Sequence, residues 1–221
     1  MLYRKIVIFI IVLFFTFSFI RKSEENTDKF IVVIDAGHGG KDSGTIGYNK
    51  LKEKDINLSI ALITKYITEK YDSNIKIILT RKEDIFIDLK KRAEIAKYFK
   101  ADLFISIHAD YNPNKNAKGG GIFLEKNIKS KNYDILNYKK SLKYALILDN
   151  ILTKKLKMKS RGIQFDNFSV LRNTLSDMPS ILLEVGFISN KEEALYFEEK
   201  GKKGIAYSLS KSIILYKKEN E

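Results

Sequence analysis

Two histidines and two glutamates are the residues of this sequence best suited to hydrolytic chemistry. His38 and His108 are the only histidines among the 221 residues, and cysteine is absent. Any bound metal ion must therefore be held by His, Asp or Glu. Catalytic zinc takes three such ligands and leaves one position for water, which the metal activates near neutral pH. We predict His38, Glu53 and His108 as the ligands, and Glu184 as the general base that takes the proton of that water.

Taken one at a time, these residues also have ordinary structural explanations. A histidine after a glycine-rich turn is often a surface residue, and one at the end of a strand is often a core residue. A glutamate in the first turn of a helix favours the helix dipole. The glycine-rich segment 35–44 could instead bind phosphate, but it lacks the signature of a P-loop or a dinucleotide site. Glu184 could also be a fourth ligand in the resting enzyme.

Strand-like and helix-like segments alternate along the chain, and they must bring these residues together. Short apolar, β-branched runs predict buried strands, and apolar residues at every third or fourth position predict helices. The expected strands are 30–35, 75–80, 103–107, 121–124, 168–171 and 181–184. The expected helices are 53–71, 88–99, about 140–157 and a last one that carries Ile205, Leu209, Ile213 and Tyr216.

This alternation predicts a single-domain α/β fold with a mostly parallel, twisted sheet and helices on both faces. In such sheets, functional groups gather beyond the carboxyl ends of the strands. His38, His108 and Glu184 each follow or end an expected strand. Glu53 lies in the first turn of the helix that follows the first loop. We therefore expect all four side chains at one edge of the sheet.

The composition limits the classes of partner. The formal net charge is +13, and apolar residues make up 44% of the chain. A basic protein can bind nucleic acid or an anionic wall or membrane surface. The lysines are spread along the whole chain, with no basic run interleaved with aromatic residues, so no nucleic-acid binding is expected. The absence of cysteine excludes thiolate metal sites and cysteine nucleophiles.

The first 22 residues have the pattern of an export signal. A short positive head is followed by a mostly apolar run over residues 6–20, typical of a signal peptide or an uncleaved signal-anchor. No small-x-small cleavage site is evident, so both readings stay open. Residues 23–29 are polar and are expected to form a short tether. Residues 30–221 would then form an exported catalytic domain, in the periplasm or cell wall and possibly anchored in the membrane.

Motifs in a fixed order cover about residues 30–217. They are Ile31-Val-Val-Ile-Asp-Ala-Gly-His-Gly-Gly40, Leu51-Lys-Glu53-Lys-Asp-Ile-Asn-Leu58, Leu79-Thr-Arg81-Lys-Glu-Asp84, Leu89-Lys-Lys-Arg92-Ala-Glu-Ile-Ala96, Phe104-Ile-Ser-Ile-His108-Ala-Asp110, Arg161-Gly162, Val170-Leu-Arg172 and Pro179-Ser-Ile-Leu-Leu-Glu184-Val-Gly-Phe-Ile-Ser-Asn190. Together they resemble the zinc-dependent N-acetylmuramoyl-L-alanine amidases, the type 3 amidase family. Two departures are small: Ala36 stands where the family often has Pro, and Asp110 replaces a frequent Asn.

The resemblance implies an enzyme that hydrolyses the amide bond between N-acetylmuramic acid and L-alanine in peptidoglycan. It implies Zn2+ on His38, Glu53 and His108, with Glu184 as the catalytic carboxylate. Two alternatives remain, a zinc peptidase that cuts the stem peptide and a non-catalytic wall-binding module. Arg172 is a candidate substrate contact, whereas Arg81 and Arg92 are expected to have structural roles. The sequence does not identify an activator protein.

Overall fold

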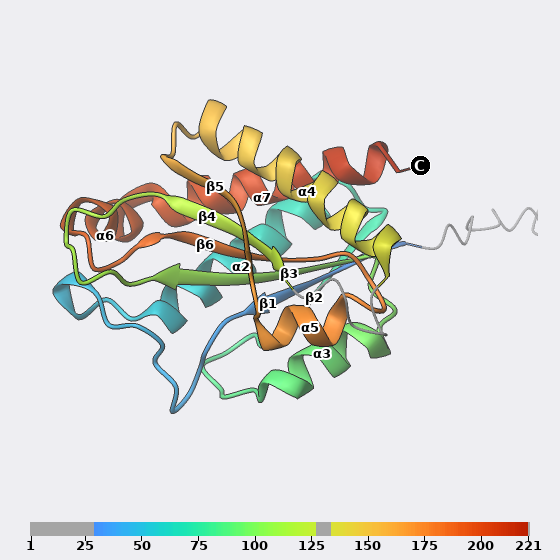
Figure 1. Ribbon diagram of the computed structural model, residues 1–221, viewed down its shortest axis with the longest axis horizontal. Coiled ribbons are helices and arrows are strands. Elements are labelled where there is room, and N and C mark those ends of the chain that lie inside the picture. The colour runs from blue at the N-terminus through green and yellow to red at the C-terminus, as the bar shows by residue number, and fades with distance from the viewer. Residues whose placement is uncertain (1–28, 127–133, 221) are drawn as a thin grey trace, which may run out of the picture.

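The computed structural model describes residues 29–126 and 134–220 (Figure 1). The expected signal or anchor segment, and all of the tether but Lys29, lie outside these ranges. None of the described helices combines the length and apolar character needed to cross a membrane.

Six strands form one sheet, as the alternating pattern predicts. They are β1 (Phe30–Ala36), β2 (Ile75–Leu79), β3 (Leu103–Asp110), β4 (Gly120–Glu125), β5 (Ser160–Asp166) and β6 (Ser180–Phe187). Their order across the sheet is β2-β1-β3-β6-β4-β5. The pairing is parallel except between β4 and β6, which are antiparallel. The prediction of a mostly parallel sheet is therefore confirmed.

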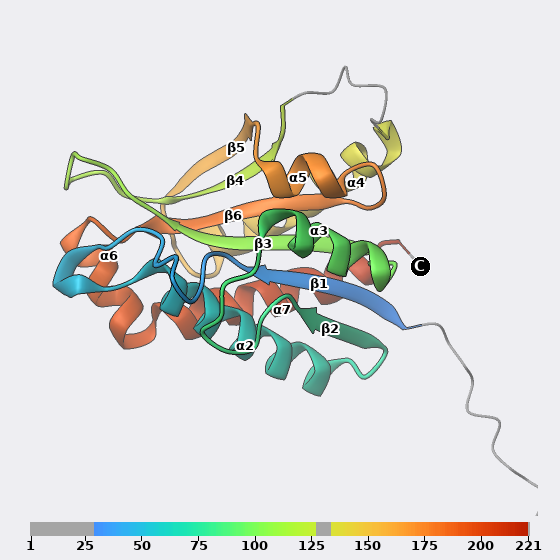
Figure 2. The same cartoon turned by 90° about the horizontal axis from the view of Figure 1, so that it is seen from below.

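Helices cover both faces of this sheet (Figures 1 and 2). One face carries α2 (Glu53–Tyr71), α4 (Ile135–Lys154) and α7 (Lys202–Lys218), of which α7 packs against both α2 and α4. The other face carries α3 (Leu89–Tyr98) and α5 (Ser169–Thr174), which pack together. Three short elements, η1 (Tyr48–Lys50), α6 (Lys191–Tyr196) and η2 (Phe197–Gly201), belong to the connections.

The core is divided by the sheet into a larger and a smaller half. Along β1, Val32 and Ile34 belong to the larger cluster, under α2, α4 and α7, whereas Val33 belongs to the smaller one. Alternate residues of a strand point to opposite faces, so a continuous apolar run is what a strand buried on both faces requires. This burial fixes the register of the central strands and so the positions of the residues at their ends.

The expected helix 53–71 has the same limits in the structure, and α4 begins earlier than expected, at Ile135. The prediction of a strand at 168–171 is wrong, because α5 occupies Ser169–Thr174. Val170 and Leu171 are buried in the smaller core from this short helix. A run of only a few apolar residues cannot distinguish a strand from a turn of buried helix.

Strand β5 was not predicted from the sequence. It lies at the edge of the sheet next to β4, and none of its residues is fully buried. An edge strand pairs with a single neighbouring strand, and here both of its faces are partly exposed. Its sequence therefore does not need a regular pattern of apolar residues. Its place matters for the site, because it carries Arg161.

Candidate metal centre

Three donor residues converge at the carboxyl ends of β1 and β3. His38 lies in the loop after β1, Glu53 is the first residue of α2, and His108 lies within β3. One ligand atom from each can be chosen so that all lie within 4.8 Å of one another. Glu53 Oε1 is 3.1 Å from His38 Nε2 and 2.9 Å from His108 Nδ1. This group of nitrogen and oxygen donors could hold a metal ion.

The loop after β1 holds His38 in an unusual backbone conformation. His38 has φ 60°, in the left-handed region that non-glycine residues seldom adopt. Its Nδ1 is 2.8 Å from Asp42 Oδ2, while Asp42 Oδ1 accepts a hydrogen bond from Gly44 N. A carboxylate on the far nitrogen orients an imidazole and leaves the other nitrogen to face a ligand.

Glu53 is fixed by backbone donors on both sides. Its Oε2 accepts a hydrogen bond from Thr45 N at 2.8 Å, and its Oε1 accepts one from Ala109 N at 3.1 Å. Gly44, with φ 60°, lies close to the side chains of both Glu53 and His38. A Cβ at this position would lie 2.6 Å from Glu53 Oε2 and from His38 Cδ2. Only glycine therefore fits at position 44 without displacing the two donors.

The two arginines predicted to be structural are both buried under this loop. Arg92 pairs with Asp35 at 2.7 Å and donates to the carbonyl oxygens of Ala36 and His38. Arg81 donates to the backbone carbonyls of Ala36, Gly37 and Lys54. These bonds tie the loop to α2 and α3, which confirms the structural role.

Glu184 lies on β6, directly beside His108 in the parallel register. Its Oε2 is buried and has no hydrogen-bond partner, so this oxygen is free to accept a proton. Burial raises the pKa of Glu184 to about 7; the charge of His108 opposes this, whereas those of Glu53 and Asp110 add to it. A carboxylate with a pKa near neutrality is well suited to accept and return a proton.

The charges of the three donors act strongly on one another. Burial lowers the pKa of His38, but the hydrogen bonds and charges of Glu53 and Asp42 outweigh it and raise the pKa to about 9. Burial acts on His108 in the same way, and its bond with Glu53 raises its pKa. Burial raises the pKa of Glu53, but its bonds to the two histidines outweigh this and hold it far below the usual range. The cluster is thus an anionic carboxylate between two imidazoles that favour the protonated form.

Arg161 is a charged residue beside the site for which the sequence predicts no role. On β5 it lies over the Phe187 ring at 4.3 Å, and its Nη1 pairs with Asp110 Oδ2 at 3.0 Å. Its Nε and Nη2 are buried without hydrogen-bond partners. Its charge also acts on Glu184. The only sequence feature at this position is an arginine immediately before a glycine, and this feature does not indicate where the arginine side chain lies.

Arg172, the residue predicted to contact substrate, is exposed on α5. Its Nη1 donates to the backbone carbonyl of Asn167 at 3.0 Å and to the Asn167 side chain. It is not part of the group formed by His38, Glu53 and His108. Its role toward substrate therefore stays a prediction.

A pocket of about 340 Å³ opens at the metal centre. His38 and His108 form part of its wall, together with Asp42, Phe86 and Leu89. Phe86 and Leu89 are large apolar residues that are themselves partly exposed, at 43% and 52%. An apolar wall beside a polar centre is a common arrangement in small-molecule and peptide sites.

Known proteins resemble this chain over most of its length. The family model described as N-acetylmuramoyl-L-alanine amidase matches residues 32–214. The chain is 33% identical over 197 residues to the N-acetylmuramoyl-L-alanine amidase AmiC of Escherichia coli O6:H1, an alignment that covers 74% of this chain and 46% of AmiC. The chain thus spans about half the length of the first curated relatives that it matches.

Solved structures are similar over most of the chain. An N-acetylmuramoyl-L-alanine amidase from Clostridium difficile 630 superposes with a TM-score of 0.78 at 30% identity, covering 88% of this chain and 100% of that one. The CwlD amidase from Clostridioides difficile, solved in complex with the GerS lipoprotein, has a TM-score of 0.75 at 26% identity and covers 86% and 99%.

Proposed function

The chain belongs to the N-acetylmuramoyl-L-alanine amidase family, and from that membership we propose that it hydrolyses the amide bond between the lactyl group of N-acetylmuramic acid and L-alanine in bacterial peptidoglycan. The observation that carries the proposal is the convergence of His38, Glu53 and His108 beside Glu184, whose Oε2 is buried and has no hydrogen-bond partner.

Zn2+ is the metal that this donor set fits. Two imidazoles and one carboxylate, without sulfur, are a usual ligand set of catalytic zinc. Asp42 on the far nitrogen of His38 supplies the outer hydrogen bond that zinc-binding imidazoles usually make. We assign His38, Glu53 and His108 as the ligands. When bound, zinc supplies Lewis acidity, which makes water nucleophilic near neutral pH and polarises a carbonyl group.

Glu184 is the residue that we propose moves the proton. Its free Oε2 accepts a proton from the attacking water as the water oxygen bonds to the lactyl carbonyl carbon. The same carboxyl group then returns this proton to the nitrogen of L-alanine as the C–N bond breaks. The products are a lactyl carboxylic acid on the sugar and a stem peptide with a free amino group.

Analysis of a peptidoglycan digest tests the reaction. Mass spectrometry of purified wall treated with the protein and zinc should find intact stem peptides that begin with L-alanine. A zinc peptidase would release shortened stems instead. A non-catalytic wall-binding module would bind the wall and release nothing. Either of the last two results would refute the amidase proposal.

The place of action follows from the substrate. Peptidoglycan lies outside the cytoplasm, so we propose that residues 30–221 act there as the catalytic domain. Residues 1–22, as a signal peptide or signal-anchor, would carry them across the membrane, and residues 23–29 would form the tether. We retain Arg172 as a candidate substrate contact. The similar CwlD amidase was solved in complex with the GerS lipoprotein, and we propose that a protein partner be sought for this chain too, with an activator as one candidate.

A further inference from the structure

Two pockets of different charge flank the metal centre. The one bordered by His38 and His108 contains the carboxylates of Asp42 and Asp88 together with the ion pair of Asp35 and Arg92, and we call it the acidic pocket. The second has a volume of about 610 Å³, and its walls carry Tyr48, Tyr111, Lys115, Lys118 and Lys191, with Glu192 as their acidic member. We call it the lysine pocket.

The walls of the lysine pocket are linked to the metal centre by short stretches of chain. Thr45 N donates to Glu53 Oε2, and the next residue, Ile46, lines the pocket. Tyr111, on the opposite side, follows the last residue of β3, the strand that carries His108. Three residues of extended chain span at most about 11 Å, so Tyr111 lies within that distance of His108, and a peptide several residues long that is bound at the metal centre can reach this pocket.

Two of its lysines are positioned by tyrosines rather than by acids. Lys115 Nζ lies 4.2 Å from the centre of the Tyr111 ring and 3.0 Å from its hydroxyl oxygen. Lys191 Nζ lies 5.6 Å from the centre of the Tyr48 ring. Neither ammonium group is within ion-pair distance of an acidic side chain in the described parts of the chain. By contrast, Lys118 is paired with Glu192 at 2.5 Å. Lys115 and Lys191 thus remain available to an incoming anion.

The pocket is held in shape by Asn190, which is only 4% exposed. Its Nδ2 donates to the backbone carbonyl of Lys115 at 2.7 Å. Its Oδ1 caps α6 by accepting hydrogen bonds from Glu192 N and Glu193 N. This side chain joins the loop of Lys115 to the helix of Lys191, so the backbone segments that carry the two lysines are fixed relative to one another.

We propose that the lysine pocket binds the carboxylates of the peptide stem, through Lys115 and Lys191. This inference rests on the proposed amidase function. The two arms of that substrate differ in charge, because the acyl side is an uncharged sugar and the amine side is a peptide that carries carboxylates. The two lysines attract such a peptide to their pocket, whereas the arginine on the wall of the acidic pocket, Arg92, is already paired with Asp35. The scissile amide is thereby oriented with its nitrogen toward the lysine pocket.

Two matched substrates test the assignment. They are N-acetylmuramoyl peptides that differ only in whether the stem carboxylates are free or amidated. For the wild type, KM should be about three- to tenfold lower for the free carboxylates, as expected for two partly exposed charge pairs. In the double variant Lys115→Gln/Lys191→Gln, KM for this substrate should rise to the value for the amidated one. The kcat for both substrates should stay close to wild type, because neither lysine touches the reacting atoms.

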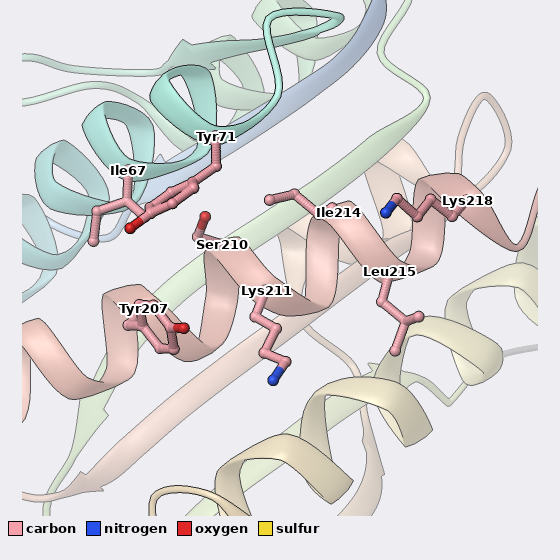
Figure 3. Close-up of a pocket in the computed structure, with 8 residues that line it drawn as sticks. All are labelled: Ile67, Tyr71, Tyr207, Ser210, Lys211, Ile214, Leu215 and Lys218. Carbon is pink, nitrogen blue, oxygen red and sulfur yellow. The ribbon is translucent and has the colours of Figure 1, made fainter.

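The control is a second double variant, Lys211→Gln/Lys218→Gln. These lysines line a groove between α2 and α7 that shares no residue with either pocket (Figure 3). The net charge falls by the same amount, so a loss of general attraction to an anionic substrate would affect both variants equally. The proposal requires that this variant keep the wild-type preference.

Three outcomes would overturn the inference. They are equal KM values for the two substrates in the wild type, an unchanged substrate preference in the Lys115/Lys191 variant, or an equal loss of that preference in the Lys211/Lys218 control. In each case cleavage at the amide bond would still support the amidase function. If neither substrate is cleaved, the amidase function itself fails. Calorimetry with the isolated stem peptide then decides the pocket separately: about three- to tenfold weaker binding to the Lys115/Lys191 variant alone supports the pocket, and binding equal to wild type refutes it.

Discussion

At the scale of single residues, the metal centre depends on very few groups. The chain has two histidines, and both reach the same carboxylate, Glu53, within 3.1 Å. No cysteine exists to take over a lost ligand. Substitutions at these positions should therefore have separable effects on the metal and on the reaction.

The histidines should be indispensable for the metal. The purified protein is expected to bind about one zinc ion per chain, and His38→Ala or His108→Ala should remove most of it, because three ligands are the minimum of a stable catalytic site. Zinc content by atomic absorption after dialysis measures this. Near-stoichiometric zinc in the double His38→Ala/His108→Ala variant would place the metal elsewhere.

Glu184→Gln should separate catalysis from metal binding. Glutamine keeps the shape of the side chain but cannot accept the proton, so the rate should fall by about 10²–10⁴-fold, the usual worth of a general acid-base group. Zinc content should stay near wild type, because His38, Glu53 and His108 remain. A Glu184→Gln protein that loses its zinc would show instead that Glu184 is a fourth ligand.

Zinc binding to the metal-free protein should be coupled to proton release. Glu53 and Asp42 raise the pKa of His38 to about 9, so its ring carries a proton at pH 7 that must leave before the nitrogen can bind a metal. The apparent zinc affinity should therefore increase as pH rises from about 6.5 to about 9, roughly tenfold per pH unit for each proton released. Titrations with chelator-buffered zinc measure it. An affinity independent of pH in this range would contradict the charge state that we assign to His38.

At the scale of the elements, a buried polar network connects the strands to the loop that carries His38. Asp35 on β1 accepts hydrogen bonds from Thr80, which follows β2, from Ser106 on β3 and from Arg92 on α3. Arg92 in turn donates to the carbonyl oxygen of His38. The network thus fixes the backbone of His38, a proposed metal ligand, relative to β1, β3 and α3.

Arg92→Met should be strongly destabilising. It leaves the carboxylate of Asp35 buried without its cation, which typically costs about 3–5 kcal/mol. Urea denaturation of the metal-free protein measures the loss. The adjacent Lys91→Met is the control. Lys91 is exposed, and its one ion pair within residues 29–126 and 134–220 is with exposed Glu94, so the effect of this substitution should stay within about 0.5 kcal/mol. Equal effects of the two substitutions would show that the network contributes no special stability.

At the scale of the whole molecule, two features bear on where the protein works. The N-terminal 22 residues have the pattern of an export signal, and the net charge of the chain is +13. The first would deliver the domain to the wall. The second would hold it near anionic wall or membrane surfaces in a salt-dependent manner.

Fractionation of cells that express the full chain checks both features. The protein should be found outside the cytoplasm, in the membrane or wall fraction, and high salt should release the part that is held by charge alone. Removal of residues 1–22 should leave the protein in the cytosol. A full-length protein that remains in the cytosol would contradict export by this segment.

The sequence by itself determined most of the fold, and it predicted that the residues we propose for the site would lie at one edge of the sheet, where the structure brings them together. Burial on both faces makes β1, β3 and β6 continuous apolar runs, and burial on one face gives α2 and α7 their helical periodicity. The site residues could be read at the ends of those segments, because parallel strands end at a common edge. The pattern failed at Val170 and Leu171, where the apolar run was too short to show a period, and at the partly exposed edge strand β5.

Only the tertiary structure decided which distant side chains face one another. Local periodicity reports how each segment is buried, but the neighbours of a residue depend on the order of the strands. The insertion of β6 between β3 and β4 places Glu184 beside His108. The addition of β5 beyond β4 brings Arg161 to Asp110. The contact of Asn190 with the loop of Lys115 spans 75 residues. Such contacts arise from the packing of the whole chain, and no short stretch of sequence records them.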